Sequence, residues 1–144
     1  MLYFDTSFIV PYILPEAISN RVQRFFVDHQ SEELTIIHWT RIEFASMLSR
    51  EVRLGGLTEQ AARDADARFE SAIAQSFFVV LPDRSDFDLG KHYVQRFETA
   101  LRGGDALHLA IAKNRNAQAF YTLDKKLLKA AKIIGLPIAT GIRD

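Results

Sequence analysis

Four acidic residues carry the chemistry that the sequence offers: Asp5, Glu43, Asp105 and Asp124, each beside an apolar segment. Carboxylates that cluster raise one another's pKa and destabilise a fold unless a cation neutralises them. Hard divalent ions such as Mg²⁺ and Mn²⁺ prefer oxygen ligands, and Mg²⁺ often bridges carboxylates to a substrate phosphate. If the fold brings the four residues together, they predict a divalent-metal site that acts on a phosphodiester.

Two of these acids lie where a strand should pass into a helix. Asp5 closes the apolar run 2–4, and Asp124 closes the run 119–123. Ligand sites of open α/β sheets form outside the carboxyl ends of the strands, so residues far apart in sequence can meet there. Either residue has a purely structural alternative, because Asp is a favoured N-cap of helices.

The other two acids lie within helical patterns. Asp105 follows Gly103-Gly104 and precedes an apolar stretch, so stabilisation of a first helical turn by a carboxylate is an adequate structural alternative. Glu43 follows Trp39 by four residues and precedes Met47 by four, which places it in an apolar helical row. Its structural alternative is an edge residue paired with an arginine.

The elements that must position these acids follow from the pattern of apolar residues. Short continuous apolar runs predict a buried parallel sheet of about five strands, at 2–4, 34–37, 77–81, 119–122 and 137–139. Apolar stripes at helical spacing lie between them. The stripes are Ile18, Val22, Phe25 and Phe26; Ala62, Ala65, Phe69 and Ala72; Tyr93, Val94, Phe97 and Leu101; and Leu127, Leu128, Ala131 and Ile134.

The order of these elements is a βα alternation with one departure. Helices at 39–54 and 58–76, the second with Thr58 as N-cap, follow each other without a strand between them, which predicts an inserted helical hairpin. Chain breaks are expected at Pro15, Gly55-Gly56, Pro82, Gly103-Gly104 and Gly135.

Composition narrows the class of protein. The 144 residues, 48% of them hydrophobic, predict a single domain over residues 1–144. Eighteen basic residues balance eighteen acidic ones, so polyanion binding requires a local patch. The absence of cysteine excludes disulfides and thiolate chemistry. No apolar run reaches about 18 residues and no basic leader precedes Leu2, so we expect no membrane association and a cytoplasmic location.

Four segments together resemble one protein family, the PIN-domain ribonucleases, and in size and order the VapC toxins of toxin-antitoxin pairs. The segments are Tyr3-Phe4-Asp5-Thr6-Ser7, Arg41-Ile42-Glu43-Phe44-Ala45, Gly104-Asp105-Ala106-Leu107-His108-Leu109-Ala110 and Tyr121-Thr122-Leu123-Asp124. The resemblance implies a three-layer α/β/α fold. It also implies that Asp5, Glu43, Asp105 and Asp124 form the catalytic and metal-binding set, supported by the hydroxyls of Ser7, Thr122 and Thr6.

The function implied by the resemblance is hydrolysis of RNA by a metal-bound water, with Mg²⁺ or Mn²⁺ as cofactor. A homodimer and a small inhibiting antitoxin are the implied protein partners. Some relatives carry a further acid soon after the fourth, where this chain has Lys125 and Lys126, so the number of ions stays open. Two rivals remain: a catalytically idle PIN-fold binding module, and a haloacid-dehalogenase-like phosphatase, which would want a second Asp where Ser7 stands.

Several further residues have two interpretations. Arg102, Lys125 and Lys126 are candidate contacts to RNA phosphates, although lysines on one helix also form an ordinary solvated face. His108 has a spacing from Asp105 that would allow a shared metal, but we interpret it as a helix-packing residue. The aromatic residues Trp39, Phe77 and Phe78, which would be able to stack on bases, are assigned to packing.

Overall fold

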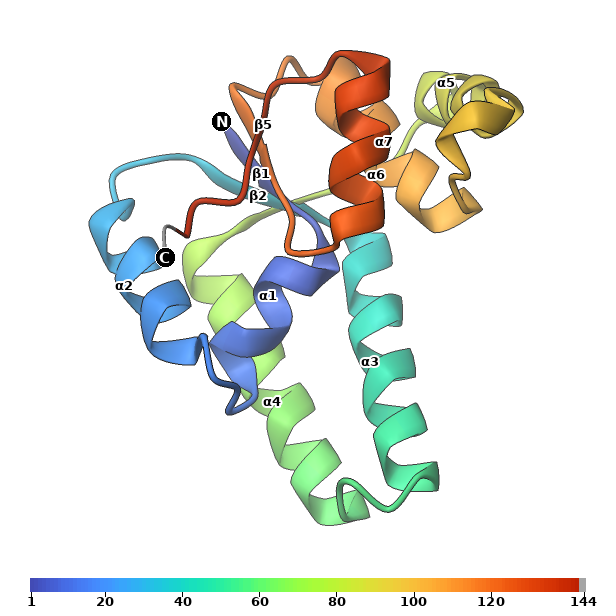
Figure 1. The fold of residues 1–144 in the computed structure, drawn as a ribbon. Coiled ribbons are helices and arrows are strands. Elements are labelled where there is room, and N and C mark those ends of the chain that lie inside the picture. Colours follow the sequence, from blue (N-terminus) through green and yellow to red (C-terminus); the bar gives the residue numbers. More distant parts are fainter. Residues whose placement is uncertain (143–144) are drawn as a thin grey trace.

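A computed structural model describes residues 1–142 as a parallel five-stranded sheet flanked by helices on both faces (Figure 1). The strand order is β3-β2-β1-β4-β5, so β1 lies at the centre. The strands are β1 (Leu2–Phe4), β2 (Leu34–Ile37), β3 (Phe78–Val80), β4 (Ala119–Tyr121) and β5 (Ile138–Ala139). The helices are α1 (Thr6–Ile13), α2 (Ser19–Asp28), α3 (His38–Arg53), α4 (Glu59–Ser76), α5 (Arg84–Gln95), α6 (Gly103–Asn114) and α7 (Lys125–Ile134). The α/β fold with five parallel strands is confirmed.

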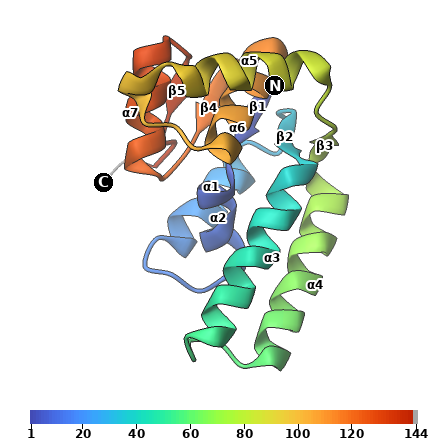
Figure 2. The same ribbon diagram turned by 90° about the vertical axis from the view of Figure 1, so that its right-hand side faces the viewer.

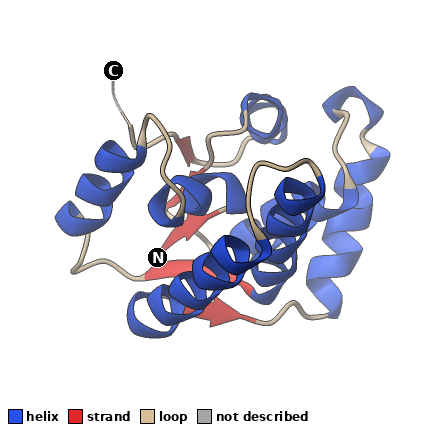
Figure 3. Cartoon of the chain, turned by 90° about the horizontal axis from the view of Figure 1, so that it is seen from below, coloured by secondary structure: helices blue, strands red, loops and turns tan. Residues whose placement is uncertain are grey.

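Alternation along the strands divides the core into two halves, one on each face of the sheet. Phe4 of β1 packs with the aromatic residues of α1 and α2, such as Phe8 and Phe25, whereas Tyr3 points to the other face and stacks on Phe120 at 5.4 Å. Successive side chains of a strand point to opposite faces, so one short strand supplies both halves. Figure 3 shows the resulting layers, with helices on either side of the strands.

The inserted hairpin of α3 and α4 is confirmed. Figures 1 and 2 show the two helices side by side, extending away from the sheet. Phe44 and Phe69 stack between them with ring centroids 4.4 Å apart, and the Thr58 hydroxyl caps α4 by accepting from the Ala61 N–H. Within residues 1–142, no helix is both long and apolar enough to cross a membrane.

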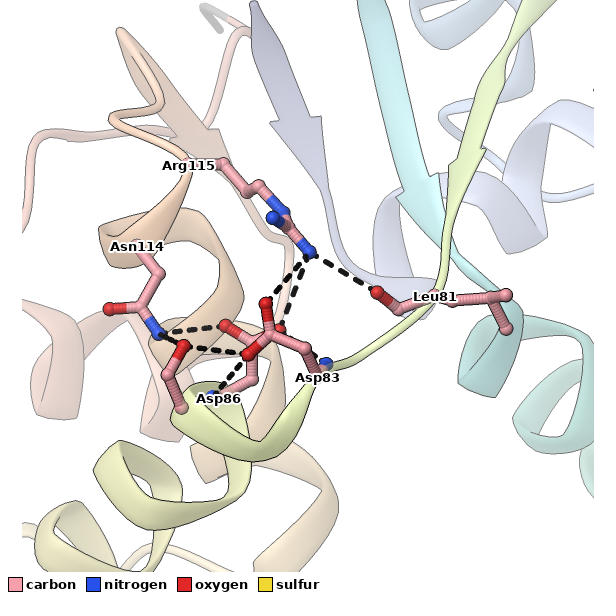
Figure 4. A network of polar contacts seen from close by, with 6 residues as sticks. Leu81, Asp83, Asp86, Asn114 and Arg115 are labelled. Carbon is pink, nitrogen blue, oxygen red and sulfur yellow. Dashed lines mark hydrogen bonds and ion pairs between the residues drawn. The ribbon is translucent and has the colours of Figure 1, made fainter.

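The start of α5 is fastened to the end of α6 by a polar network (Figure 4). Asp83 and Asp86 form a capping box, and buried Asp86 also accepts a 2.7 Å hydrogen bond from the Asn114 side chain. The Arg115 guanidinium lies 3.6 Å from the Asp86 carboxylate and donates to the Leu81 carbonyl. These contacts hold α5 against α6 at the end of α6 remote from Asp105.

Two expectations about this region are wrong. The stripe Tyr93, Val94, Phe97 and Leu101 does not form one helix, because α5 ends at Gln95 and Phe97 lies in a short 3-10 turn with 87% of its surface exposed. Ala100 then adopts a left-handed conformation, which redirects the chain. Gly103-Gly104 does not break the chain but begins α6.

Of the three aromatic residues assigned to packing, only Phe77 packs against the core. Phe77 is partly buried and packs against the core beside α2, as expected. Phe78 is 63% exposed on the edge strand β3, so its assignment to packing is wrong. Trp39, at the start of α3, is 37% exposed, which makes it a half-covered residue rather than a core one.

Candidate active site

Hydrogen bonds join the segments that follow the neighbouring strands β1 and β4 at the carboxyl edge of the sheet. The Asp5 N–H donates to the Tyr121 carbonyl at 3.1 Å, and the Leu123 N–H donates to the Ser7 hydroxyl at 2.9 Å. Phe4 and Tyr121 are register partners, so the segments that follow β1 and β4 leave the sheet side by side. The predicted meeting of these two strand ends is confirmed.

Asp5 is the most enclosed of the four acids. It is 5% exposed, and its Oδ1 accepts a 2.8 Å hydrogen bond from Ser7, with Thr122 as a second hydroxyl partner. Burial raises the pKa of Asp5 to about 6, although nearby His108 and the hydroxyls oppose that rise. Asp5 occupies the N-cap position of α1 without a side-chain capping hydrogen bond of good geometry, although the Ser7 backbone N–H also opposes the rise of its pKa.

Asp124 does cap a helix. Its Oδ1 accepts from the N–H groups of Lys126 and Leu127 at 2.7 and 3.2 Å, so the structural alternative holds for this residue. Both bonds use the same oxygen atom. A capping carboxylate with one oxygen engaged on backbone still presents negative charge to its surroundings.

Glu43 is a hydrogen-bonded carboxylate whose partners come from α1, α3 and α6. Its Oε2 accepts from the Thr6 hydroxyl and from His108 Nε2, the latter at 2.7 Å, and Trp39 is a further hydrogen-bond partner. Burial alone would raise the pKa of Glu43, but these hydrogen bonds and the His108 charge hold it below its ordinary value. Arg41 pairs with Glu70 instead, so the edge-residue alternative for Glu43 is wrong.

Asp105 lies in the first turn of α6, as expected, and is half-buried. Its pKa is raised by burial and by the charges of Asp124 and Glu43, against the opposing charges of His108 and Arg102. Asp105 and Asp124 line a groove of about 700 Å³ together with basic side chains. The basic lining residues are Arg102, Lys125, Lys126 and Lys129.

His108 is the residue whose role the sequence interpretation missed. It is buried in α6 as expected, but its Nε2 bonds to Glu43 and its Nδ1 lies 2.8 Å from the Tyr3 hydroxyl. Burial lowers its pKa, but Glu43, Asp5 and Asp105 together raise it above the ordinary value. The charges of three carboxylates therefore act on one imidazole. The only signal in the sequence was its position three residues after Asp105.

The oxygen donors of these residues are of the kind that divalent ions prefer, but they do not form a complete coordination site. In the described part of the chain, no group of three or more Asp, Glu or His side chains is arranged to hold a metal. The carboxylate oxygen donors are those that Mg²⁺ and Mn²⁺ prefer, and a cation would relieve the repulsion that raises the pKa of Asp105.

The chain belongs to the PIN domain family, whose pattern it matches over residues 2–133. Comparison with curated proteins gives no match.

Solved structures of VapC toxins and their relatives share the fold. FitAcB from Neisseria gonorrhoeae superposes with a TM-score of 0.75 at 17% identity, covering 98% of both chains. VapC20 from Mycobacterium tuberculosis, a sarcin-ricin loop cleaving toxin, superposes with a TM-score of 0.70 at 17% identity, covering 94% of this chain and 96% of VapC20. VapBC-1 from nontypeable Haemophilus influenzae gives 0.69 at 14% identity over 98% of both chains.

Proposed function

We propose that this PIN domain is a Mg²⁺- or Mn²⁺-dependent endoribonuclease whose catalytic set is Asp5, Glu43, Asp105 and Asp124. The observation that carries the proposal is the hydrogen bond of Glu43 to His108 at 2.7 Å, together with the charges of Asp5 and Asp105 that act on the same imidazole and the charge of Asp124 that raises the pKa of Asp105. Buried acids with raised pKa values are typical of functional sites, because a fold tolerates them poorly without a purpose.

Different residues of the site have different roles in the proposed reaction. Asp5 and Asp105 are the carboxylates whose pKa values are raised, so they are the direct candidates to hold the ion. When bound, the ion supplies a water of lowered pKa and stabilises the charge that develops on the phosphate. Ser7 and Thr122 hold Asp5, while Arg102, Lys125 and Lys126 line the groove where phosphates of the RNA would lie.

A protein inhibitor is the second part of the proposal. We propose that this chain is a toxin that forms a homodimer and is held inactive by an antitoxin; its fold likeness to VapC20, a toxin by name, supports the toxin role. An antitoxin arginine would suit the acidic site, because its planar guanidinium pairs with carboxylates bidentately. Glu43→Gln should then weaken antitoxin binding as well as cleavage.

The direct test is cleavage of a mixed RNA substrate by the purified chain with Mg²⁺, Mn²⁺, Ca²⁺ or EDTA. We expect products with Mg²⁺ and Mn²⁺, few with Ca²⁺, because Ca²⁺ prefers more ligands in looser geometry, and none with EDTA. Asp5→Asn is the matched inactive control. Cleavage that survives EDTA would refute the metal mechanism, and no cleavage under any condition would favour the idle binding module. Membership of the PIN family argues against the phosphatase alternative.

The inhibitor test follows from the same site. If a small open reading frame is found adjacent to the gene, its product is co-expressed as the candidate antitoxin, and its affinity is measured for wild type and for each of the four neutralised variants. Affinity that is indifferent to all four substitutions would place inhibition away from the acidic site.

A further inference from the structure

Glu43 is connected to the interior of the protein by a continuous chain of hydrogen bonds. Tyr3 and His108 are both buried, at 0% and 1% exposure, and their rings meet edge to face with centroids 5.9 Å apart. The Tyr3 hydroxyl contacts His108 Nδ1 at 2.8 Å, and His108 Nε2 contacts Glu43 at 2.7 Å. The path runs from β1 through α6 to α3, so three elements meet in it.

The direction of these bonds follows from the chemistry of the groups. An ionised carboxylate only accepts hydrogen bonds, so Nε2 of His108 must carry the proton that it shares with Glu43. If the imidazole is neutral, Nδ1 accepts from the Tyr3 hydroxyl, and if it is charged, Nδ1 donates to it. In both states the proton on Nε2 points at Glu43. Tyr3 thereby fixes the ring orientation that Glu43 requires.

Further contacts restrict the conformation of the Glu43 side chain. The Thr6 hydroxyl donates to the same Oε2, and Trp39 is a further hydrogen-bond partner. On the other side, a Cβ added at Gly104 would lie 3.1 Å from Glu43 Oε1 and 2.9 Å from Trp39 Nε1. The carboxylate is thus held by contacts from α1, α3 and α6, although 26% of the Glu43 side chain stays exposed.

We propose that His108 is a positioning residue of the site, which holds the Glu43 carboxylate in place through its Nε2 proton and is itself oriented by Tyr3. The hydrogen bonds of this inference are seen in the structure, whereas its expected effect on kcat rests on the proposed nuclease function. Partners in the layer behind a metal site set the orientation of its carboxylates and imidazoles, and their loss commonly reduces activity or metal affinity about 10- to 100-fold.

Two substitutions at His108 separate positioning from simple packing. His108→Leu fills a similar volume without a donor, whereas His108→Gln keeps an amide N–H at about the reach of Nε2. We expect kcat to fall about 10-fold or more for His108→Leu with little change in KM, and to be largely retained by His108→Gln. Tyr3→Phe should give an intermediate loss. His92→Leu, on the exposed face of α5, is the matched control.

A double-mutant cycle tests whether the effect passes through Glu43. If it does, His108→Leu should lower kcat in the wild type but not further in Glu43→Gln, because the carboxylate to be positioned is already neutral. Equal losses in both backgrounds would overturn the proposal, as would wild-type kcat in His108→Leu. Should His108→Leu fail to fold, the same comparisons are made with Tyr3→Phe.

A measurement without RNA keeps the inference separate from the proposed function. Histidine-selective ¹⁵N NMR of the metal-free protein should show a proton on His108 Nε2 that is protected from exchange, and Glu43→Gln should shift its resonance. Mn²⁺ affinity, followed by electron paramagnetic resonance, should fall in His108→Leu but not in His92→Leu. If the wild type cleaves no RNA, the proposed function fails while these two readouts still decide the positioning role. An unprotonated Nε2 would refute it.

Discussion

The hydroxyl oxygen of Ser7 lies 3.2 Å from the hydroxyl oxygen of Thr122, although 115 positions separate the two residues. The Ser7 hydroxyl donates to Asp5 Oδ1 and accepts from the Leu123 N–H. The Thr122 hydroxyl accepts from the Asp124 N–H. This pair therefore joins the β1–α1 junction to the β4–α7 junction, and each hydroxyl touches the segment that carries one of the proposed catalytic acids.

We predict that Ser7→Ala lowers the free energy of unfolding by about 1 to 3 kcal/mol, because the Leu123 N–H loses its acceptor and buried Asp5 loses a donor. Urea denaturation measures the difference. Ser71→Ala is the matched control, since exposed Ser71 only accepts a bond from the Gln75 side chain, and it should change stability by less than about 0.5 kcal/mol. Equal stability of Ser7→Ala and wild type would show that the two junctions are held by other contacts.

We predict that Asp5→Asn abolishes RNA cleavage but stabilises the metal-free protein above pH 6. The pKa of Asp5 is raised from 3.8 to about 6 on folding. The folded state thus binds the proton more tightly, and its stability falls as pH rises between those values. Removing the ionisable group should recover on the order of 1 to 3 kcal/mol at pH 7.5.

Thermal denaturation with EDTA from pH 4.5 to 8 checks this behaviour. The stabilisation by Asp5→Asn should appear as pH rises from 4.5 towards 6 and level off above that, and Mn²⁺ should raise the melting temperature of wild type only. A variant that is less stable than wild type at pH 7.5 would contradict the burial argument.

We predict that Lys126→Ala weakens RNA binding in a salt-dependent manner, because Lys126 lines the groove that Asp105 and Asp124 share. Neutralising one phosphate contact should reduce the slope of log affinity against log salt by about 0.7 to 1. Fluorescence anisotropy with single-stranded RNA, in an Asp5→Asn background to prevent cleavage, gives the slope. Lys113→Ala, in the last turn of α6, should leave it unchanged. Identical slopes for all three proteins would show that Lys126 does not contact RNA phosphates and belongs to an ordinary solvated helix face.

We predict that Asp86→Ala destabilises the fold by about 2 to 4 kcal/mol without abolishing cleavage by the molecules that stay folded. Asp86 is fully buried and binds the Asp83 N–H and the Asn114 side chain, so its loss releases the start of α5 from α6 (Figure 4). Chemical denaturation and specific activity are measured together. Asp88→Ala on the same helix, whose ion pair with Arg84 is exposed, should change stability by less than about 1 kcal/mol.

The failed helix between 93 and 101 shows where a periodic pattern misleads. Tyr93 is buried and Phe97 is almost fully exposed, so apolar residues four apart do not share a face here. Helix α5 begins at Arg84 and is fixed by contacts with Asn114 and Arg115, about thirty positions later in the chain. Such contacts decide which face of α5 is buried, and no window of local sequence contains them.

The sequence by itself determined the order of the strands, the helical hairpin and the placement of Asp5 and Asp124 at strand ends, because these depend on local apolar runs and capping residues. Tertiary structure alone decided the electrostatics of the site. Glu43 and His108 are 65 positions apart, and only the approach of the N-terminal part of α3 to that of α6 makes one the partner of the other. Burial, which raises the pKa of Asp5, likewise arises only when the helices close over the sheet.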